Sequence, residues 1–128
     1  MIYLDTSVAL AHLLGEDAGP PDALWNETLV SSRLLEYELW TRVHARGLGT
    51  SHGADARALL DRVAMAELSP LVLARAMEPF PLPVRTLDAM HLATLDFLRG
   101  QGQRVQLATY DRRMADVARR WRVPLVAL

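Results

Sequence analysis

Two aspartates follow short β-prone runs at the points where the chain turns into a helix. Asp5 comes directly after the run 2–4, and Asp111 comes soon after the run 104–108. In open α/β sheets the reactive groups lie at the carboxyl ends of the strands, so both acids lie where a site is expected. For Asp5 alone, capping of the first helix explains the residue equally well. Further acids at the same edge would favour a site.

Two such acids, Asp88 and Glu38, fit poorly with a freely solvated surface. Asp88 lies in the first turn of a strongly helical segment, on the same stripe as Leu92. It is therefore either a partner of the helix N-terminus or a ligand. Glu38 lies in the second turn of another predicted helix, where a surface ion pair with Arg42 is the alternative. Glu36 competes with Glu38 for any role, and periodicity favours Glu38 only mildly.

Four carboxylates gathered in one place require cations. Their mutual repulsion raises their pKa values and destabilises the fold unless positive charge compensates. The chain has no Cys, and its four His residues show no metal-binding spacing. Carboxylate oxygens without such partners suit Mg²⁺ or Mn²⁺ better than Zn²⁺. These ions, singly or as a pair about 4 Å apart, activate water and stabilise charge during phosphodiester hydrolysis.

Strands alternate with helices along the chain, which predicts a parallel sheet covered on both faces. Gly- and Pro-rich loops are expected at 15–22 and 79–86. We expect Ser32, Ser69 and Thr86 to cap helices, and Thr6 or Ser7 to cap the first one. The expected strands are 2–4, 28–31, 67–69, 104–108 and 125–127, and the expected helices are 8–14, 21–25, 32–46, 53–66, 70–78, 86–100 and 112–121. His91, inside the helix 86–100, is expected to be a core residue or a support for the site.

Composition argues against several protein families in which the first strand is likewise followed by an aspartate and a turn. The chain has 128 residues, which predicts one domain over 1–128, and its 14 basic residues are all Arg. Haloacid-dehalogenase-like phosphatases, response-regulator receivers and P-loop NTPases need a Lys, so the absence of Lys argues against all three. The net charge of −1 argues against indiscriminate nucleic-acid binding but leaves room for a local basic rim. Without an apolar run of membrane-spanning length, we expect a cytoplasmic protein.

Four segments together resemble the PIN domain family, and within it the VapC-type ribonuclease toxins of toxin–antitoxin pairs. The segments are MIYLDTSVA (1–9), SSRLLEYELWTR (31–42), RTLDAMHLATL (85–95) and LATYDRRMADVARRW (107–121). They occur in the order typical of the family and cover essentially the whole chain. Each one is weak by itself, but the ordered set is quite specific. The resemblance implies a single PIN-like domain with a three-layer α/β/α fold and a central parallel sheet of four to five strands.

The resemblance also implies roles for particular residues. Asp5 matches the first metal ligand, Asp88 and Asp111 match the later two, and the register of the second segment selects Glu38 over Glu36. The metal would be Mg²⁺ or Mn²⁺, and these four acids would form the catalytic site. The positions that commonly orient the metal ligands or the water are Thr6, Ser7 and Thr109. The candidates for holding RNA phosphates are Arg112 and Arg113, for which solvated surface arginines are the alternative.

Three functions follow as hypotheses. The first is a metal-dependent endoribonuclease that acts as a toxin, usually dimeric and neutralised by a small VapB-like antitoxin encoded alongside. The second keeps the nuclease but assigns it to RNA maturation without an antitoxin. The third is a degenerate PIN fold that only binds a partner, against which the intact set of acids argues. If the protein is a dimer, we expect its interface among the helices between Trp40 and Met77.

Overall fold

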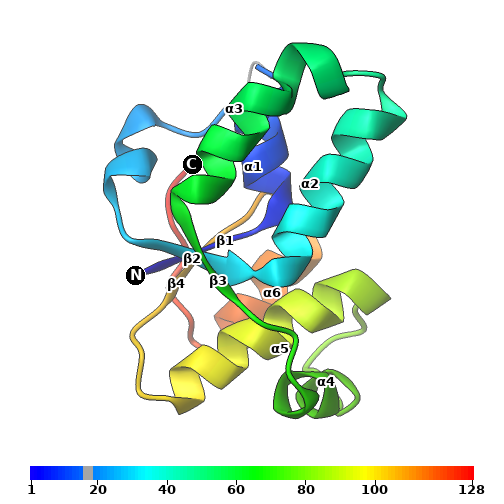
Figure 1. The fold of residues 1–128 in the computed structure, drawn as a ribbon. Coiled ribbons are helices and arrows are strands. Elements are labelled where there is room, and N and C mark those ends of the chain that lie inside the picture. The colour runs from blue at the N-terminus through cyan, green and yellow to red at the C-terminus, as the bar shows by residue number, and fades with distance from the viewer. Residues whose placement is uncertain (16–18) are drawn as a thin grey trace.

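Four parallel strands form one sheet in the middle of the molecule, in the order β3-β2-β1-β4 (Figure 1). The computed structural model describes residues 1–15 and 19–128. The strands are β1 (Ile2–Leu4), β2 (Leu29–Ser32), β3 (Val63–Ala66) and β4 (Gln106–Ala108). The helices are α1 (Thr6–Leu13), the 3₁₀ helix η1 (Asp22–Asn26), α2 (Arg33–Ala45), α3 (Gly49–Asp61), α4 (Pro70–Ala76), α5 (Thr86–Gly100) and α6 (Arg112–Arg120). Among the described helices, none has the length and apolar character needed to span a membrane.

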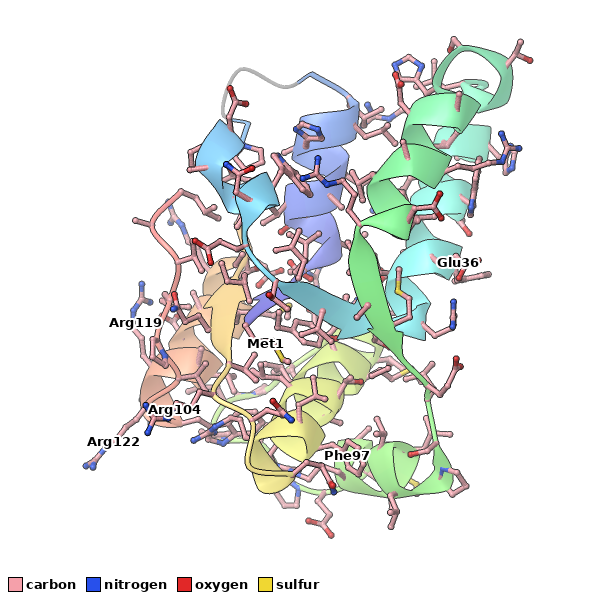
Figure 2. The ribbon with its side chains drawn as sticks, turned by 60° about the vertical axis from the view of Figure 1, so that its left-hand side comes forward. Met1, Glu36, Phe97, Arg104, Arg119 and Arg122 are labelled. Atoms are coloured by element: carbon pink, nitrogen blue, oxygen red, sulfur yellow. The ribbon has the colours of Figure 1, made fainter. Side chains whose placement is uncertain are left out.

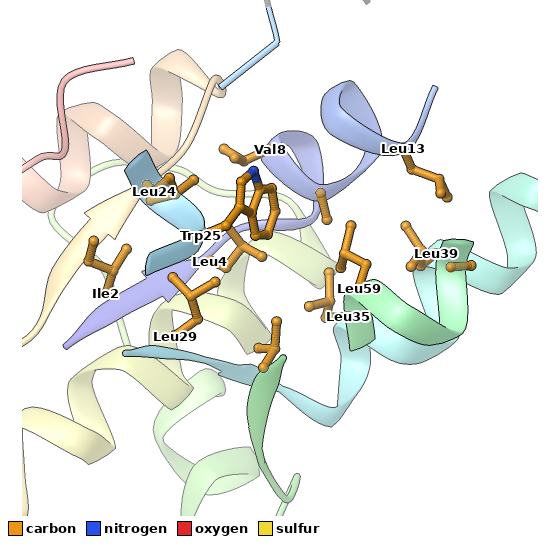
Figure 3. Packing of buried hydrophobic residues seen from close by; sticks show 14 of the residues in the cluster. Ile2, Leu4, Val8, Leu13, Leu24, Trp25, Leu29, Leu35, Leu39 and Leu59 are labelled. Carbon is orange, nitrogen blue, oxygen red and sulfur yellow. The ribbon is translucent and has the colours of Figure 1, made fainter. Parts of the chain in front are cut away.

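Helices cover both faces of this sheet, with α1, α2 and α3 on one side and α5 and α6 on the other (Figure 1). Side chains alternate between the two faces along a strand, so Ile2 and Leu4 pack under the first group of helices while Tyr3 packs under the second. Figure 3 shows Leu4, Trp25 and Leu35 among the residues of the first of these cores. The chain is therefore a single α/β domain with three layers, as predicted.

Strand pairing brings the ends of β1 and β4 level with each other. Leu4 pairs with Ala108, and the Asp5 N–H donates to the Ala108 carbonyl at 3.0 Å. The residues that follow these two strands therefore start from adjacent points at the carboxyl edge of the sheet. This edge is where the sequence predicts a site.

The segment 49–69 differs from its prediction. A helix was expected over 53–66 and a strand over 67–69, but α3 ends at Asp61 and β3 occupies Val63–Ala66. The spacing of Leu59, Leu60 and Val63 is helical, which predicts one continuous helix for this segment. Pairing with β2 overrides this pattern, because residues 63–66 align with 29–32 along the whole of β2.

The ends of other elements also correct the predictions. The final strand expected at 125–127 is wrong, since Leu125 forms only an isolated bridge with Leu107. Thr6 and Thr86 are the first helical residues of α1 and α5 and do not cap them. The caps at Ser32 and Ser69 are confirmed, because each hydroxyl accepts a hydrogen bond from the backbone of its helix. The loop expected at 15–22 includes residues 16–18, which lie outside the described residues.

Candidate functional site

Three helices begin at the carboxyl edge of the sheet, and an acid stands at the start of each. Asp5 and Asp111 occupy the N-cap positions of α1 and α6, and Asp88 lies in the first turn of α5. The N-terminus of a helix carries partial positive charge, which favours carboxylates at these positions. The strand-to-helix turns place Asp5 and Asp111 at this edge, and the start of α5 adds Asp88. The helix N-termini partly offset the negative charge of all three.

The Asp5 carboxylate is buried and held by two hydroxyl groups. Asp5 is only 4% exposed. Ser7 Oγ donates to Asp5 Oδ2 at 2.6 Å, and Thr109 Oγ1 donates to the same oxygen at 2.8 Å. The side chain makes no capping bond to α1, so capping does not explain this residue. Within residues 1–15 and 19–128, Asp5 Oδ1 accepts no hydrogen bond and keeps its lone pairs available.

The same two hydroxyls fasten the segment 109–111 to the start of α1. Thr109 Oγ1 accepts the Asp111 N–H at 2.9 Å while it donates to Asp5. Ser7 Oγ accepts the Tyr110 N–H at 3.0 Å while it donates to Asp5. Each hydroxyl thus uses its hydrogen on the carboxylate and a lone pair on the backbone. This arrangement fixes Asp5 relative to Asp111, although the two come from opposite ends of the chain.

Asp111 and Asp88 are bridged by one guanidinium group, that of Arg85. Arg85 Nη2 donates to Asp111 Oδ2 at 2.9 Å, and Arg85 Nε donates to Asp88 Oδ2 at 3.0 Å. The other Asp111 oxygen, Oδ1, accepts the Met114 N–H at 3.0 Å and caps α6. Asp111 therefore serves both as a helix cap and as part of the acidic group. The cation that the acids require is supplied here by the chain itself.

Burial raises the pKa of Asp88 above its ordinary value. The Arg85 guanidinium lowers it, and the charges of Asp111 and Asp5 raise it further. The pKa stays raised because of burial, since the lowering by Arg85 offsets the repulsion from Asp111 and Asp5. Three carboxylates beside one guanidinium nevertheless leave this edge of the sheet with negative charge. Residual negative potential of this kind attracts a further cation.

Glu38 faces the site, whereas Glu36 does not. Thr6 Oγ1 donates to Glu38 Oε1 at 2.9 Å, and His91 Nε2 lies 2.6 Å from the same oxygen. Glu36 lies on the outer side of α2 and pairs with Arg33 at 2.8 Å (Figure 2). No ion pair joins Glu38 to Arg42 in the described part of the chain. The alternative of a surface pair for Glu38 is therefore wrong.

The acids fit a hard divalent cation, but their present positions do not yet enclose one. In the ranges 1–15 and 19–128, no three Asp, Glu or His side chains lie close enough together to hold a metal ion. Arg85 draws the oxygens of Asp88 and Asp111 toward its guanidinium. Its exposed side chain can leave, and the atoms it would release are carboxylate oxygens, which suit Mg²⁺ or Mn²⁺.

Arginines are distributed unevenly around this edge. Arg112 and Arg113 are exposed at the start of α6, directly after Asp111, and neither contacts an acid among the described residues. Arg104, Arg119 and Arg122 point outward on another side of the molecule (Figure 2). Arg104 precedes β4 and Arg122 follows α6, so both belong to the amino edge of the sheet. Besides Arg85, which bridges Asp88 and Asp111, the pair Arg112 and Arg113 therefore lies beside the aspartates.

Sequence reasoning missed Arg85 and Tyr3. Arg85 stands three residues before Asp88, a spacing at which side chains meet at the start of a helix. The surrounding prolines predict only a rigid loop for this segment. Tyr3 lies on β1 with its hydroxyl 2.8 Å from His91 Nδ1. Strand alternation could have assigned Tyr3 to the face covered by α5, but not this contact.

Comparison with known proteins gives the family of the chain. No curated protein matches it. The family model described as the PIN domain matches residues 2–120, which include all four acids and the whole sheet. The protein therefore belongs to the PIN domain family.

Proposed function

We propose that this protein is a Mg²⁺- or Mn²⁺-dependent endoribonuclease that acts as the toxin of a toxin–antitoxin pair. PIN domains are generally metal-dependent nucleases, and their substrates are RNA or other nucleic acids. The observation that carries the proposal is the convergence of Asp5, Asp88 and Asp111 at one edge of the sheet, with Glu38 held nearby. A surface without a catalytic role gains nothing from carboxylates that repel one another.

Asp5, Asp88, Asp111 and Glu38 would hold the ion. When bound, a divalent cation activates water and stabilises charge on the phosphodiester. Ser7 and Thr109 would keep the Asp5 carboxylate in place through the bonds they already donate. Arg85 would leave Asp88 and Asp111 and turn toward solvent, where 68% of its side chain is already exposed.

Arg112 and Arg113 would hold phosphates of the RNA on either side of the scissile bond. They are exposed and lie next to Asp111, so a strand that reaches the acids also passes these guanidinium groups. Guanidinium groups bind phosphate oxygens in pairs of parallel hydrogen bonds. The slight negative net charge of the chain fits selection of a looped or structured RNA better than uniform coating of any polyanion.

Cleavage of RNA by purified protein tests the enzymatic part of the proposal. Wild type should cleave with Mg²⁺ or Mn²⁺, lose activity in EDTA, and lose it also in the Asp5→Asn variant. Asp116→Asn is the matched control, because Asp116 is an exposed acid of α6 whose ion-pair partner among the described residues is Arg119. Calorimetric titration with Mn²⁺ should give saturable binding to wild type and to the control, and none to Asp5→Asn. A folded Asp5→Asn protein that cleaves at the wild-type rate would refute the assignment.

The toxin role has its own test. Expression of the chain in a bacterial host should arrest growth, and Asp5→Asn should relieve the arrest. Co-expression of a short open reading frame next to the gene should also relieve it and yield a stable complex. Growth arrest that no neighbouring frame relieves would instead favour a nuclease of RNA maturation. A protein that neither cleaves RNA nor binds Mn²⁺ at millimolar levels would favour a binding module.

A homodimer is the assembly we propose. Leu71 and Met77, within or next to α4, are 70% and 82% exposed. Met77 and the proline-rich segment after α4 line an apolar groove together with Leu73, Phe80, Leu82, Val84 and Met90. Exposed apolar surface of this kind marks protein–protein contacts. Leu73, Ala76 and Met77 fall within the interval 40–77 in which an interface was expected, and the other lining residues lie beyond it.

A further inference from the structure

A chain of hydrogen bonds through the protein interior ends at Glu38. The Ser32 N–H donates to the Tyr3 hydroxyl at 3.1 Å, and this hydroxyl lies 2.8 Å from His91 Nδ1. His91 Nε2 lies 2.6 Å from Glu38 Oε1. Tyr3 and His91 are 0% and 1% exposed, so the chain runs through the core and reaches the surface only at Glu38.

The geometry determines which nitrogen of His91 carries a hydrogen. A carboxylate only accepts hydrogen bonds, so the contact with Glu38 requires a hydrogen on Nε2. The Tyr3 oxygen accepts from Ser32, and His91 Nδ1, 2.8 Å away, is an acceptor in reach of the hydroxyl hydrogen. His91 is therefore the Nε2–H tautomer, with Tyr3 donating to Nδ1.

We propose that His91 is a positioning residue that fixes the Glu38 carboxylate for the nuclease reaction, with Tyr3 selecting the tautomer that can do so. The inference rests on the proposed function of Glu38. It extends that function to two buried residues that touch neither the substrate nor the metal.

Three features distinguish this arrangement from a histidine that is merely accommodated in the core. His91 lies edge-on to the Tyr3 ring, with the ring planes at 83°, so the tyrosine holds the imidazole from one side. Thr6 Oγ1 lies 3.2 Å from His91 Nε2 and donates to the same Glu38 oxygen. Glu38 Oε1 is thus held from α1 and from α5, while Oε2 accepts no hydrogen bond within the described residues. A flexible glutamate near the surface would otherwise sample several rotamers.

The first test reads the tautomer without any catalysis. Long-range ¹H–¹⁵N spectra of the metal-free protein should give His91 as the Nε2–H form, with its proton strongly deshielded by the short bond to Glu38. Glu38→Gln should move this proton signal upfield, and Tyr3→Phe should change the Nδ1 signal. A wild-type His91 that carries its hydrogen on Nδ1 would overturn the inference.

The second test separates positioning from packing. His91→Leu keeps the volume apolar and removes the donor, whereas His91→Gln offers an amide donor near the position of Nε2. We expect His91→Leu to lower kcat on RNA by about 10- to 100-fold, as removal of a supporting hydrogen bond does at metal sites, with little change in KM. His91→Gln should restore most of kcat. The Mn²⁺ affinity should likewise be lower in His91→Leu than in His91→Gln and wild type.

Leu95→Ala is the control for destabilisation, because Leu95 is fully buried on α5 and contacts none of the acids among the described residues. Loss of kcat in Leu95→Ala equal to that in His91→Leu would assign His91 to packing alone and overturn the inference. So would a folded His91→Leu variant with wild-type kcat. If wild type itself cleaves no RNA, the proposed function fails, and the tautomer spectra with the Mn²⁺ titrations still decide whether His91 orients Glu38.

Discussion

Arg85 supplies the positive charge between Asp88 and Asp111 in the metal-free protein. A metal ion bound at the proposed site would compete with this guanidinium for the carboxylate oxygens that Arg85 contacts. Arg85 is 68% exposed, and solvent weakens the ion pairs of exposed side chains. We therefore expect Arg85 to lower the metal affinity of the proposed site without abolishing it.

Replacement of Arg85 by Ala tests this competition. Because the variant has no guanidinium to compete with the ion, its Mn²⁺ affinity in calorimetry should rise by roughly two- to five-fold. Its metal-free melting temperature should fall, since Asp88 and Asp111 then repel without relief. Arg33→Ala is the matched control, because Arg33 bridges Glu36 and Glu67 away from the site. Equal Mn²⁺ affinity in all three proteins would contradict the competition.

Asp88 predicts a pH dependence of stability. Its pKa is raised in the folded state, so the folded protein disfavours the charged form and loses stability as pH rises through that pKa. The loss is absent below the ordinary pKa of an aspartate, where both states are protonated. In metal-free buffer, Asp88→Asn should therefore be more stable than wild type at about pH 8, and the difference should shrink toward about pH 4.

Urea denaturation at several pH values measures this difference, with Asp116→Asn as the control for loss of an exposed carboxylate. A difference between Asp88→Asn and wild type that stays constant across the range would mean that desolvation of the charge is not the cause.

At the scale of elements, α2 carries Glu38 and begins at a buried cap. Ser32 is fully buried, and its hydroxyl accepts the Leu34 N–H at 3.1 Å. The same residue ends β2 and donates its backbone N–H to Tyr3. One position therefore joins the strand, the helix and the hydrogen-bond chain that reaches Glu38.

Ser32→Ala should lower the free energy of unfolding by about 1 kcal/mol, the usual cost of losing an N-cap hydroxyl. The backbone bond to Tyr3 does not involve the hydroxyl, so nuclease activity below the unfolding transition should stay near that of wild type. Urea denaturation gives the free energy. Ser69→Ala provides the comparison, because Ser69 caps α4 through a longer bond of 3.3 Å in a less buried place and should cost less. A larger cost at Ser69 would contradict the argument from burial.

At the scale of the whole molecule, two hydrophobic cores support the sheet, and its charged carboxyl edge carries the candidate site. The alternation of side chains in β1 sends Ile2 and Leu4 to one core and Tyr3 to the other, and leaves Asp5 at the end of the strand. The acids therefore sit on a scaffold that is packed from both faces. The apolar groove next to α4 adjoins the second core, because its lining residues Phe80, Leu82 and Val84 pack against that core. Its exposed side is where we propose that a second copy of the chain binds.

Light scattering should give twice the chain mass for the wild-type protein if α4 forms the dimer contact. Leu71→Glu combined with Met77→Glu should give a monomer, because charged groups at the centre of an apolar interface are costly to bury. Tyr37→Glu is the control, since Tyr37 is also an exposed apolar residue, 65% accessible, but lies on α2. A dimer that survives the double substitution and dissociates with Tyr37→Glu would move the interface to α2.

Local pattern in the sequence determined the positions of Asp5 and Asp111, the cap at Ser32, the helix around Asp88 and the alternation of strands with helices. These features depend on the few residues before and after each position, which is why they can be read from the sequence. The end of α3 could not be read in this way, because Val63 satisfies a helical period and is a strand residue only through its pairing with β2.

Only the tertiary structure decided how the acids meet. Thr109 and Asp5 are 104 positions apart, and their contact follows from the adjacency of β1 and β4. The orientation of Glu38 toward Thr6 and His91 depends on how α2 and α5 pack against the sheet. The bridge from Arg85 to Asp111 depends on where α5 begins relative to α6. Side-chain contacts between distant segments depend on strand order and helix packing, which no local pattern encodes.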